Sequence, residues 1–316
     1  MKIAVLDWDT MICNNDIFPQ ALEKFGEISL FPMTSPEETA AHIGDSEIVL
    51  CNKVKITREI MESCPNIRYI GLFATGFNNV DIDFAKEKGI IVCNAGQYST
   101  NAVAQQVFAY ILDHCSRIRQ YDGAVRNGEW ETSPCFSYFP IPTAEIAGKT
   151  LSIVGFGAIG KKTAEIASAF GMHIIISTRT KPRNCPYETA DIDTAAKKAD
   201  FLTFHCPLTD QTRGIVNAEL LNVMKQSAVL INTSRGPVVN ERELADALNN
   251  DKIAAAYLDV LAEEPMKPDT PLKFAKNCLI TPHTAWAAYE TRLRLFDIVC
   301  QNIESWQNGK PQNKVN

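Results

Sequence analysis

The 316-residue sequence lacks the features that mark membrane proteins and nucleic-acid-binding proteins. No apolar run approaches the length of a membrane-spanning helix. No long basic run is present, and the net charge is −6, which disfavours a surface for nucleic acid or an acidic membrane. We therefore expect neither a nucleic acid nor a membrane among the partners of this protein.

The ten cysteines lack the spacing of a metal site or a disulfide framework. No two of them form a Cys-x-x-Cys pair, so we expect reduced thiols and no bound metal. Residues 1–7 indicate a strand that ends at an acidic residue, and they do not resemble a signal peptide. These observations lead us to expect a cytoplasmic protein.

The composition that is present, 46% hydrophobic and 22% charged residues, is typical of an ordinary globular chain with room for two domains. Short apolar runs alternate with helical patterns through two regions, and this alternation predicts an α/β fold with parallel sheets covered on both faces. The first region has predicted strands at 2–7, 27–31, 47–51, 69–73 and 90–93, with helices at 36–43, 57–63 and 83–88. The second has predicted strands at 150–154, 173–177, 201–204, 228–232, 254–258 and 278–280. A long helix (99–118) lies between the regions, and a final helix (287–306) follows them.

Three glycines follow the first strand of the second region at the spacing G-x-G-x-x-G. Each glycine serves a different need: Gly155 permits the tight turn, Gly157 lets a pyrophosphate approach the backbone, and Gly160 lets the helix pack on the strand. The open N–H groups at the helix start then face the phosphates. In its strand–turn–helix context the motif predicts a dinucleotide site, although a tight turn without a ligand would have the same spacing.

Polar residues follow the other predicted strands of this region, where parallel sheets bind their ligands. Reduction of a 2-oxo acid by a nicotinamide needs such groups: a histidine as proton donor, a carboxylate behind it, and an arginine to hold the substrate carboxylate. The residues after the strands are Thr178-Arg179, His205-Cys206-Pro207, Thr233-Ser234-Arg235-Gly236, Asp259 with Glu263-Glu264-Pro265, and Thr281-Pro282-His283-Thr284.

The roles of these residues are not decided by residue type alone. Both His205 and His283 end predicted strands, so either could be the acid and the other structural. Glu264 could be an exposed loop acid, whereas Arg235 beside Gly236 is hard to explain as a surface residue. In the first region, the loop 74–81 is either a plain turn or a ligand loop at the end of its strand.

Taken together, these stretches resemble the D-isomer-specific 2-hydroxyacid dehydrogenases, and the likeness extends over nearly the whole chain. The motifs that carry it are 155–160, 205–209, 231–239, Asp259-Val260 with Glu264-Pro265, and Thr281-Pro282-His283. The resemblance implies that Arg235 binds substrate, that His283 is the acid/base, and that Glu264 pairs with His283. It also implies that backbone N–H groups at Thr75 and Gly76 bind the substrate carboxylate.

The same resemblance implies the cofactor contacts and the domain organisation. The expected contacts are Gly155, Gly157, Ala158, Ile159, Gly160, Thr178, Arg179, Lys181, Cys206, Pro207, Thr212, Thr233, Ser234 and Asp259. Two Rossmann-like doubly wound domains are expected: a flavodoxin-like substrate domain (1–98 and 286–316), with a cofactor domain (99–285) inserted into it. A homodimer built on the long helix and the aromatic segment 127–142 is also implied.

Within the family, the stretches 74–81, 98–105 and 283–287 resemble the glycerate dehydrogenase (hydroxypyruvate reductase) branch. We therefore expect reduction of hydroxypyruvate, and of glyoxylate as well. The alternatives are another 2-oxo acid, such as pyruvate, and a non-catalytic regulatory protein of the same fold that senses the cofactor.

One position departs from the pattern of an NAD-selective site. Such a site usually has Asp or Glu at the end of the second strand, where it binds the ribose 2′-hydroxyl. Here that place, near Thr178, has no acid, and Arg179, Lys181 and Arg183 follow it. Cations without a carboxylate suit a 2′-phosphate, so we expect NADP to be favoured over NAD.

Overall fold

A computed structural model describes residues 1–180 and 182–316, and these residues form two compact units. Unit 1 consists of residues 1–99 and 287–316, and unit 2 consists of residues 100–286. The predicted domain boundaries lie one residue away from these. The α/β fold class, with two parallel sheets, is confirmed.

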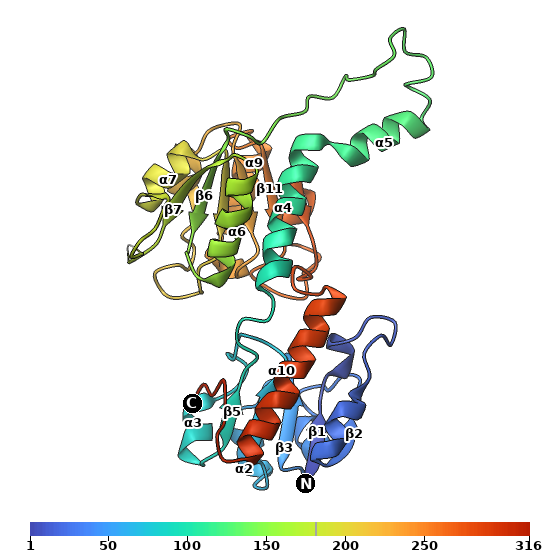
Figure 1. The fold of residues 1–316 in the computed structure, drawn as a ribbon, viewed down its shortest axis with the longest axis vertical. Coiled ribbons are helices and arrows are strands. Elements are labelled where there is room, and N and C mark those ends of the chain that lie inside the picture. The colour runs from blue at the N-terminus through green and yellow to red at the C-terminus, as the bar shows by residue number, and fades with distance from the viewer. Residues whose placement is uncertain (181) are drawn as a thin grey trace. The chain divides into compact units, whose positions relative to one another are not determined.

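Unit 1 is built on a five-stranded parallel sheet in the order β2-β1-β3-β4-β5 (Figure 1). All four residues of β3 and all four of β4 are buried, as expected for apolar strands with both faces covered. Its strands are β1 (Lys2–Val5), β2 (Glu27–Leu30), β3 (Ile48–Cys51), β4 (Tyr69–Leu72) and β5 (Ile91–Cys93). Its helices are α1 (Thr39–Ile43), α2 (Arg58–Ser63), α3 (Ile82–Glu87) and α10 (Tyr289–Gln307), with short 3₁₀ segments at Trp8–Thr10 and Pro19–Phe25.

The first helix starts later than its predicted position at 36. Residues 35–38 form a turn, closed by a hydrogen bond from the N–H of Glu38 to the carbonyl of Ser35, so α1 begins only at Thr39. The five predicted strands are all present, each within one or two residues of its expected end.

The C-terminal helix α10 is an integral part of unit 1. Arg292 is 6% exposed and donates two hydrogen bonds to the Asp16 carboxylate and one to the Met11 carbonyl. Farther along α10, Phe296 packs edge-on against Trp8, and Trp306 lies against Tyr69 of β4. The C-terminal helix therefore covers a sheet whose strands all come from the first 93 residues of the chain.

Unit 2 is built on a seven-stranded parallel sheet in the order β12-β11-β10-β9-β6-β7-β8. The order in which strands are added reverses at β6, as in doubly wound folds: β7 and β8 lie on one side of β6, and β9 to β12 lie on its other side. The strands are β6 (Thr150–Val154), β7 (His173–Ser177), β8 (Glu188–Thr189), β9 (Phe201–Phe204), β10 (Val229–Asn232), β11 (Ala255–Leu258) and β12 (Cys278–Ile280). The helices are α4 (Thr100–Ser116), α5 (Ile118–Arg126), α6 (Ala158–Ala169), α7 (Ile192–Lys198), α8 (Ala218–Val223) and α9 (Glu241–Asn249), with 3₁₀ segments at Gly236–Val238 and Pro271–Phe274.

Two features of unit 2 differ from the expectation. The six predicted strands are joined by a seventh, β8, which pairs with β7 over two residues and is too short to show a periodic pattern. The long helix predicted for 99–118 ends at Ser116, because Arg117 takes a left-handed backbone conformation (φ 54°) and α5 starts anew after it.

An arm, defined as residues 118–143, projects from α4 in unit 2 (Figure 1). It carries large apolar side chains in the open: Trp130 is 50% exposed, Phe136 94% and Phe139 77%. Exposed apolar side chains gathered on one segment are typical of interaction surfaces.

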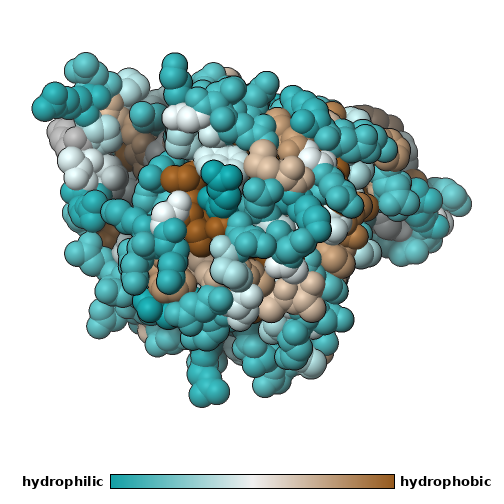
Figure 2. All heavy atoms as spheres, turned by 90° about the horizontal axis from the view of Figure 1, so that it is seen from below, coloured by the Kyte–Doolittle hydropathy of each residue, from teal (hydrophilic) through white to brown (hydrophobic). Residues whose placement is uncertain are grey.

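Among the described residues, no helix is long and apolar enough to cross a membrane. The face drawn in Figure 2 is covered mainly by hydrophilic side chains around a small hydrophobic patch.

Candidate active site

The glycine turn after β6 lies at the point where the strand order of unit 2 reverses. Gly155 has φ +96°, and a Cβ there would come within 2.7 Å of the His205 carbonyl, while a Cβ on Gly160 would come within 2.2 Å of the Gly155 oxygen. Both positions thus require glycine, one for the turn and one for the approach of α6. Gly157 differs, since a Cβ on it would meet no atom within 4 Å. Its open side, at the start of α6, fits a pyrophosphate on the helix N-terminus.

Two enclosed polar atoms lie near this turn without a hydrogen-bond partner in the described chain: His205 Nδ1 and Thr233 Oγ1. Buried polar atoms are usually satisfied, so an unsatisfied pair at the carboxyl ends of β9 and β10 indicates a missing polar ligand. The residues present therefore fit a dinucleotide.

His205 has the properties of a neutral histidine. Its Nε2 contacts Thr203 Oγ1 at 3.1 Å, and burial lowers the pKa of the imidazole to about 3. A ring that stays unprotonated near pH 7 is a poor proton donor. The geometry thus favours His283 over His205 as the acid.

The loops after β10 and β11 are in backbone contact. A Cβ on Gly236 would lie 1.8 Å from the Leu261 carbonyl, so only glycine lets the two loops approach this closely. Arg235 directly precedes this contact; its backbone oxygen accepts from Asn232 Nδ2, and its Nη1 donates to the Ser234 carbonyl. The exposed guanidinium is thereby held beside the loop that contains Glu264.

Glu264 and His283 are brought together by the structure. Glu264 Oε2 lies 2.6 Å from His283 Nδ1, and its Oε1 accepts from the N–H of Leu261 at 2.9 Å. With Nδ1 directed at the carboxylate, Nε2 is the nitrogen left to exchange a proton with a substrate. The side chain of His283 is 29% exposed.

Asp259 supports the segment on which His283 lies. The carboxylate is 2% exposed and accepts hydrogen bonds from Thr281 Oγ1 and from the N–H groups of Thr284 and Ala285. Burial raises its pKa, whereas these hydrogen bonds act in the opposite direction. The sequence predicted a cofactor contact here; in the structure, the carboxylate is directed at the backbone of residues 284 and 285.

The remaining predicted cofactor residues lie along the same edge of the sheet. Thr178 and Arg179 follow β7, Cys206 and Pro207 follow β9, and Ser234 follows β10. Thr212 Oγ1 donates to the Pro207 carbonyl, so this hydroxyl shapes the turn after β9. Ala158 and Ile159 begin α6. Lys181 lies outside the described residues.

The predicted substrate loop lies in unit 1, after β4. No hydrogen bond from the backbone N–H groups of residues 75–78 is found within the part of the chain that the structure describes. The loop is nevertheless fixed, because Thr75 Oγ1 donates to the Gly96 carbonyl and Asn94 Nδ2 donates to the Thr75 carbonyl. A fixed row of open N–H groups is suited to binding an anion.

Sequence reasoning missed Tyr110 of α4. Its hydroxyl is hydrogen-bonded to Thr281 Oγ1, which in turn donates to Asp259. The pattern of α4 placed Tyr110 only on an apolar stripe, and no local signal connects it to a residue 171 positions away.

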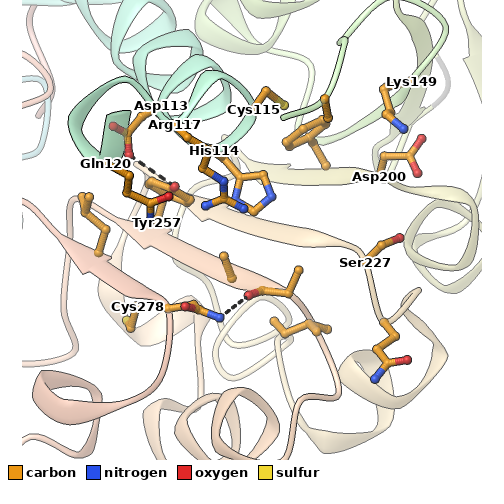
Figure 3. Close-up of a pocket in the computed structure, with 18 of the residues that line it drawn as sticks. Asp113, His114, Cys115, Arg117, Gln120, Lys149, Asp200, Ser227, Tyr257 and Cys278 are labelled. Carbon is orange, nitrogen blue, oxygen red and sulfur yellow. Dashed lines mark hydrogen bonds between the residues drawn. The ribbon is translucent and has the colours of Figure 1, made fainter. Parts of the chain in front are cut away.

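A cavity of about 770 Å³ lies at the opposite edge of the unit 2 sheet (Figure 3). It is lined by residues that precede the strands, among them Lys149, Asp200 and Ser227, and by the end of α4. Its acidic groups are paired, since Asp113 binds Arg119 and accepts from the Tyr257 hydroxyl. Parallel sheets bind substrates at their carboxyl edge, so this cavity is not the reaction site.

The model of the D-isomer specific 2-hydroxyacid dehydrogenase NAD-binding domain matches residues 108–285. A hydroxypyruvate reductase from Blautia hydrogenotrophica is 43% identical, and the alignment covers 100% of both chains. The chain belongs to the D-isomer specific 2-hydroxyacid dehydrogenase family.

Two solved structures have the same fold. One is an acyclic imino acid reductase in complex with NADPH and D-Arg, with a TM-score of 0.87, 31% identity and 100% coverage of both chains. The other is an NADPH-dependent glyoxylate/hydroxypyruvate reductase from Sinorhizobium meliloti, with a TM-score of 0.84, 28% identity and coverage of 99% and 97%. The family and the NAD(P)-dependent oxidoreductase activity predicted from the sequence are thereby confirmed.

His283 is the predicted proton donor, so we expect His283→Ala to lower kcat by about 10²–10⁴-fold. Glu264→Gln should lower kcat less, because the amide oxygen still accepts one hydrogen bond. Loss of nicotinamide absorbance measures turnover, and fluorescence titration with NADPH should show unchanged binding in both variants. An equal loss of turnover in His205→Asn, with His283→Ala active, would contradict this assignment.

His205 should make the stability of the protein depend on pH. Its folded pKa, about 3, lies below the ordinary value near 6.5, so the unfolded chain binds more protons in this window. The free energy of unfolding therefore falls as the pH decreases from 6.5. Between pH 7 and pH 5, His205 should account for a loss of up to about 2 kcal/mol.

Urea unfolding of the cofactor-free protein at pH 7 and pH 5 measures this loss. His205→Gln should show a smaller decrease than the wild type. Equal decreases would mean that His205 is protonated in the folded state.

Proposed function

We propose that this enzyme reduces hydroxypyruvate to D-glycerate and also accepts glyoxylate. The observation that carries the proposal is the 43% identity, over the full length of both chains, to a hydroxypyruvate reductase. In the reaction, the 2-oxo acid gains a hydride at its carbonyl carbon and a proton at its carbonyl oxygen. The reduced nicotinamide, when bound, supplies the hydride.

His283 supplies the proton in this proposal. Its Nε2 donates to the carbonyl oxygen, where negative charge develops as the hydride arrives. The 2.6 Å contact of Nδ1 with Glu264 supports the role, since the carboxylate fixes the orientation of the ring and favours its charged form. In the oxidation direction, the same nitrogen accepts the proton from the hydroxyl.

Arg235 and the loop after β4 hold the substrate. The Arg235 guanidinium binds the substrate carboxylate and polarises the neighbouring carbonyl. The open N–H groups of Thr75 and Gly76 donate to the same carboxylate. No acceptor for the backbone N–H groups of residues 75–78 is found in the described chain, and this supports the role.

Asp259 acts as a positioning residue in this scheme. Its buried carboxylate holds the N–H groups of Thr284 and Ala285, and its backbone oxygen accepts from the N–H of His283.

The alternative of a non-catalytic regulator is disfavoured, because the set of Arg235, Glu264 and His283 is complete.

NADPH is the cofactor that we propose to be favoured over NADH. Thr178 stands at the end of β7, where an NAD-selective site has an acid, and Arg179 and Arg183 are exposed nearby. A 2′-phosphate suits this arrangement of cations. The two related structures are named with NADPH, which supports the preference.

The arm of unit 2 supports a homodimer. Trp130, Phe136 and Phe139 leave a large apolar area open, and burial of this area against a second copy would be favourable.

All ten cysteines are free thiols, and this supports the cytoplasm as the proposed compartment.

A substrate panel tests the proposed activity. Hydroxypyruvate, glyoxylate and pyruvate are compared with NADPH and with NADH, and pyruvate is also tested with ammonia to form an imino acid. We expect the highest kcat/KM for hydroxypyruvate. Higher kcat/KM for pyruvate or its imine would reassign the substrate, and lack of turnover with every acid would overturn the proposed reaction.

Thr178→Asp tests the cofactor preference. The added carboxylate repels a 2′-phosphate and accepts from a 2′-hydroxyl, so the ratio of kcat/KM for NADPH over NADH should fall at least tenfold. Thr180→Asp, two residues farther along and exposed, serves as a charge-matched control. An unchanged ratio in Thr178→Asp would show that these cations do not select the cofactor.

A further inference from the structure

Unit 1 contains a buried carboxylate that the proposed reaction does not use. Asp7 follows β1 and is 0% exposed. It accepts hydrogen bonds from three consecutive backbone N–H groups: Asn52 at 2.8 Å, Lys53 at 2.7 Å and Val54 at 3.2 Å. Asp7 thus holds the segment 52–54, which follows β3.

The same segment is held from its other side. Asn79 Nδ2 donates to the Val54 carbonyl at 2.8 Å, and the N–H of Ile56 donates to the Asn79 carbonyl. Asn79 directly follows residues 75–78, whose backbone N–H groups are open. The segment 52–54 is therefore fixed both to β1 and to the proposed substrate loop.

A buried carboxylate is costly unless its hydrogen bonds compensate for the lost hydration. Burial raises the pKa of Asp7, and the three N–H groups oppose that rise. The hydrogen bonds to Asp7 fix the backbone of residues 52–54. The backbone of Lys53, the one charged residue in this segment, is therefore held in place.

The register of the sheet places Lys53 and the loop with the open N–H groups at the same carboxyl edge. β3 and β4 are paired, with Cys51 opposite Leu72, and the N–H of Phe73 donates to the Cys51 carbonyl. Lys53 and Thr75 follow these paired ends by two and three residues, at the same carboxyl edge of the sheet. Lys53 is an exposed residue.

We propose that Lys53 is a further substrate-binding residue, whose ammonium pairs with the carboxylate of the 2-oxo acid, and that Asp7 is the positioning residue that holds it. The proposal rests on the proposed function, since it deepens the same site. A carboxylate between a row of N–H groups and a cation is bound by charge-assisted hydrogen bonds, which are stronger than neutral ones.

Lys53→Met tests the cation directly. The side chain keeps its apolar length and loses its charge, so KM for hydroxypyruvate should rise at least tenfold while kcat changes less than threefold. The Kd for NADPH should stay unchanged. Lys53→Arg should recover most of the affinity.

The matched control is Lys55→Met, since Lys55 is an exposed lysine two residues along the same segment. It should leave KM unchanged. An unchanged KM in Lys53→Met, or an equal rise in Lys55→Met, would overturn the proposal.

Asp7→Asn tests the positioning role. The amide keeps the shape of the carboxylate but opposes one of the three N–H groups, so KM for hydroxypyruvate should rise. If Asp7 acts through Lys53, adding Asp7→Asn to Lys53→Met should raise KM no further. Additive effects would show that Asp7 acts independently of Lys53. Should Asp7→Asn fail to fold, the comparison of Lys53→Met with Lys55→Met still decides the role of Lys53.

Binding of oxalate separates this proposal from the proposed function. Calorimetry measures the Kd of oxalate with NADP-loaded enzyme, without any turnover. A wild type that binds oxalate but reduces no 2-oxo acid, with binding at least tenfold weaker in Lys53→Met, would refute the proposed reaction and retain the anion site. Equal oxalate affinity in wild type and Lys53→Met would refute the site.

Discussion

The hydrogen bond between Glu264 and His283 is the interaction on which the candidate active site of unit 2 depends. It joins the loop after β11 to the loop after β12, and each loop has its own support. Oε1 of Glu264 is held by the N–H of Leu261, and the N–H of His283 donates to the Asp259 carbonyl. The register of the parallel strands thus determines the distance between the carboxylate and the ring.

A buried aspartate after a strand serves both units in the same way. Asp7 follows β1 and binds the N–H groups of residues 52–54, and Asp259 follows β11 and binds those of Thr284 and Ala285. In each case a carboxylate hidden from water fixes a loop that belongs to a neighbouring strand. These hydrogen bonds hold the backbone of each loop in place. The side chains of the loop residues remain available for other contacts.

Much of this architecture could be predicted from the sequence, because buried parallel strands are uninterrupted apolar runs and the glycine spacing has a steric cause. The exceptions have physical reasons. β8 has two residues and hence no periodicity, and the break at Arg117 is a single backbone conformation inside a helical pattern. Residue type could not separate His205 from His283, since the difference lies in burial and in the partner Glu264. Asp7 gave no signal, because its partners are backbone groups more than 40 positions away.

The division of unit 1 between the two ends of the chain sets an order of biosynthesis. Its five strands leave the ribosome within the first 93 residues, but Phe296 and Trp306, which cover Trp8 and Tyr69, are made some two hundred residues later. Unit 2 is continuous and is completed in between. The growing chain therefore holds an uncovered apolar surface throughout the synthesis of its second unit, and during that interval it depends on protection from aggregation.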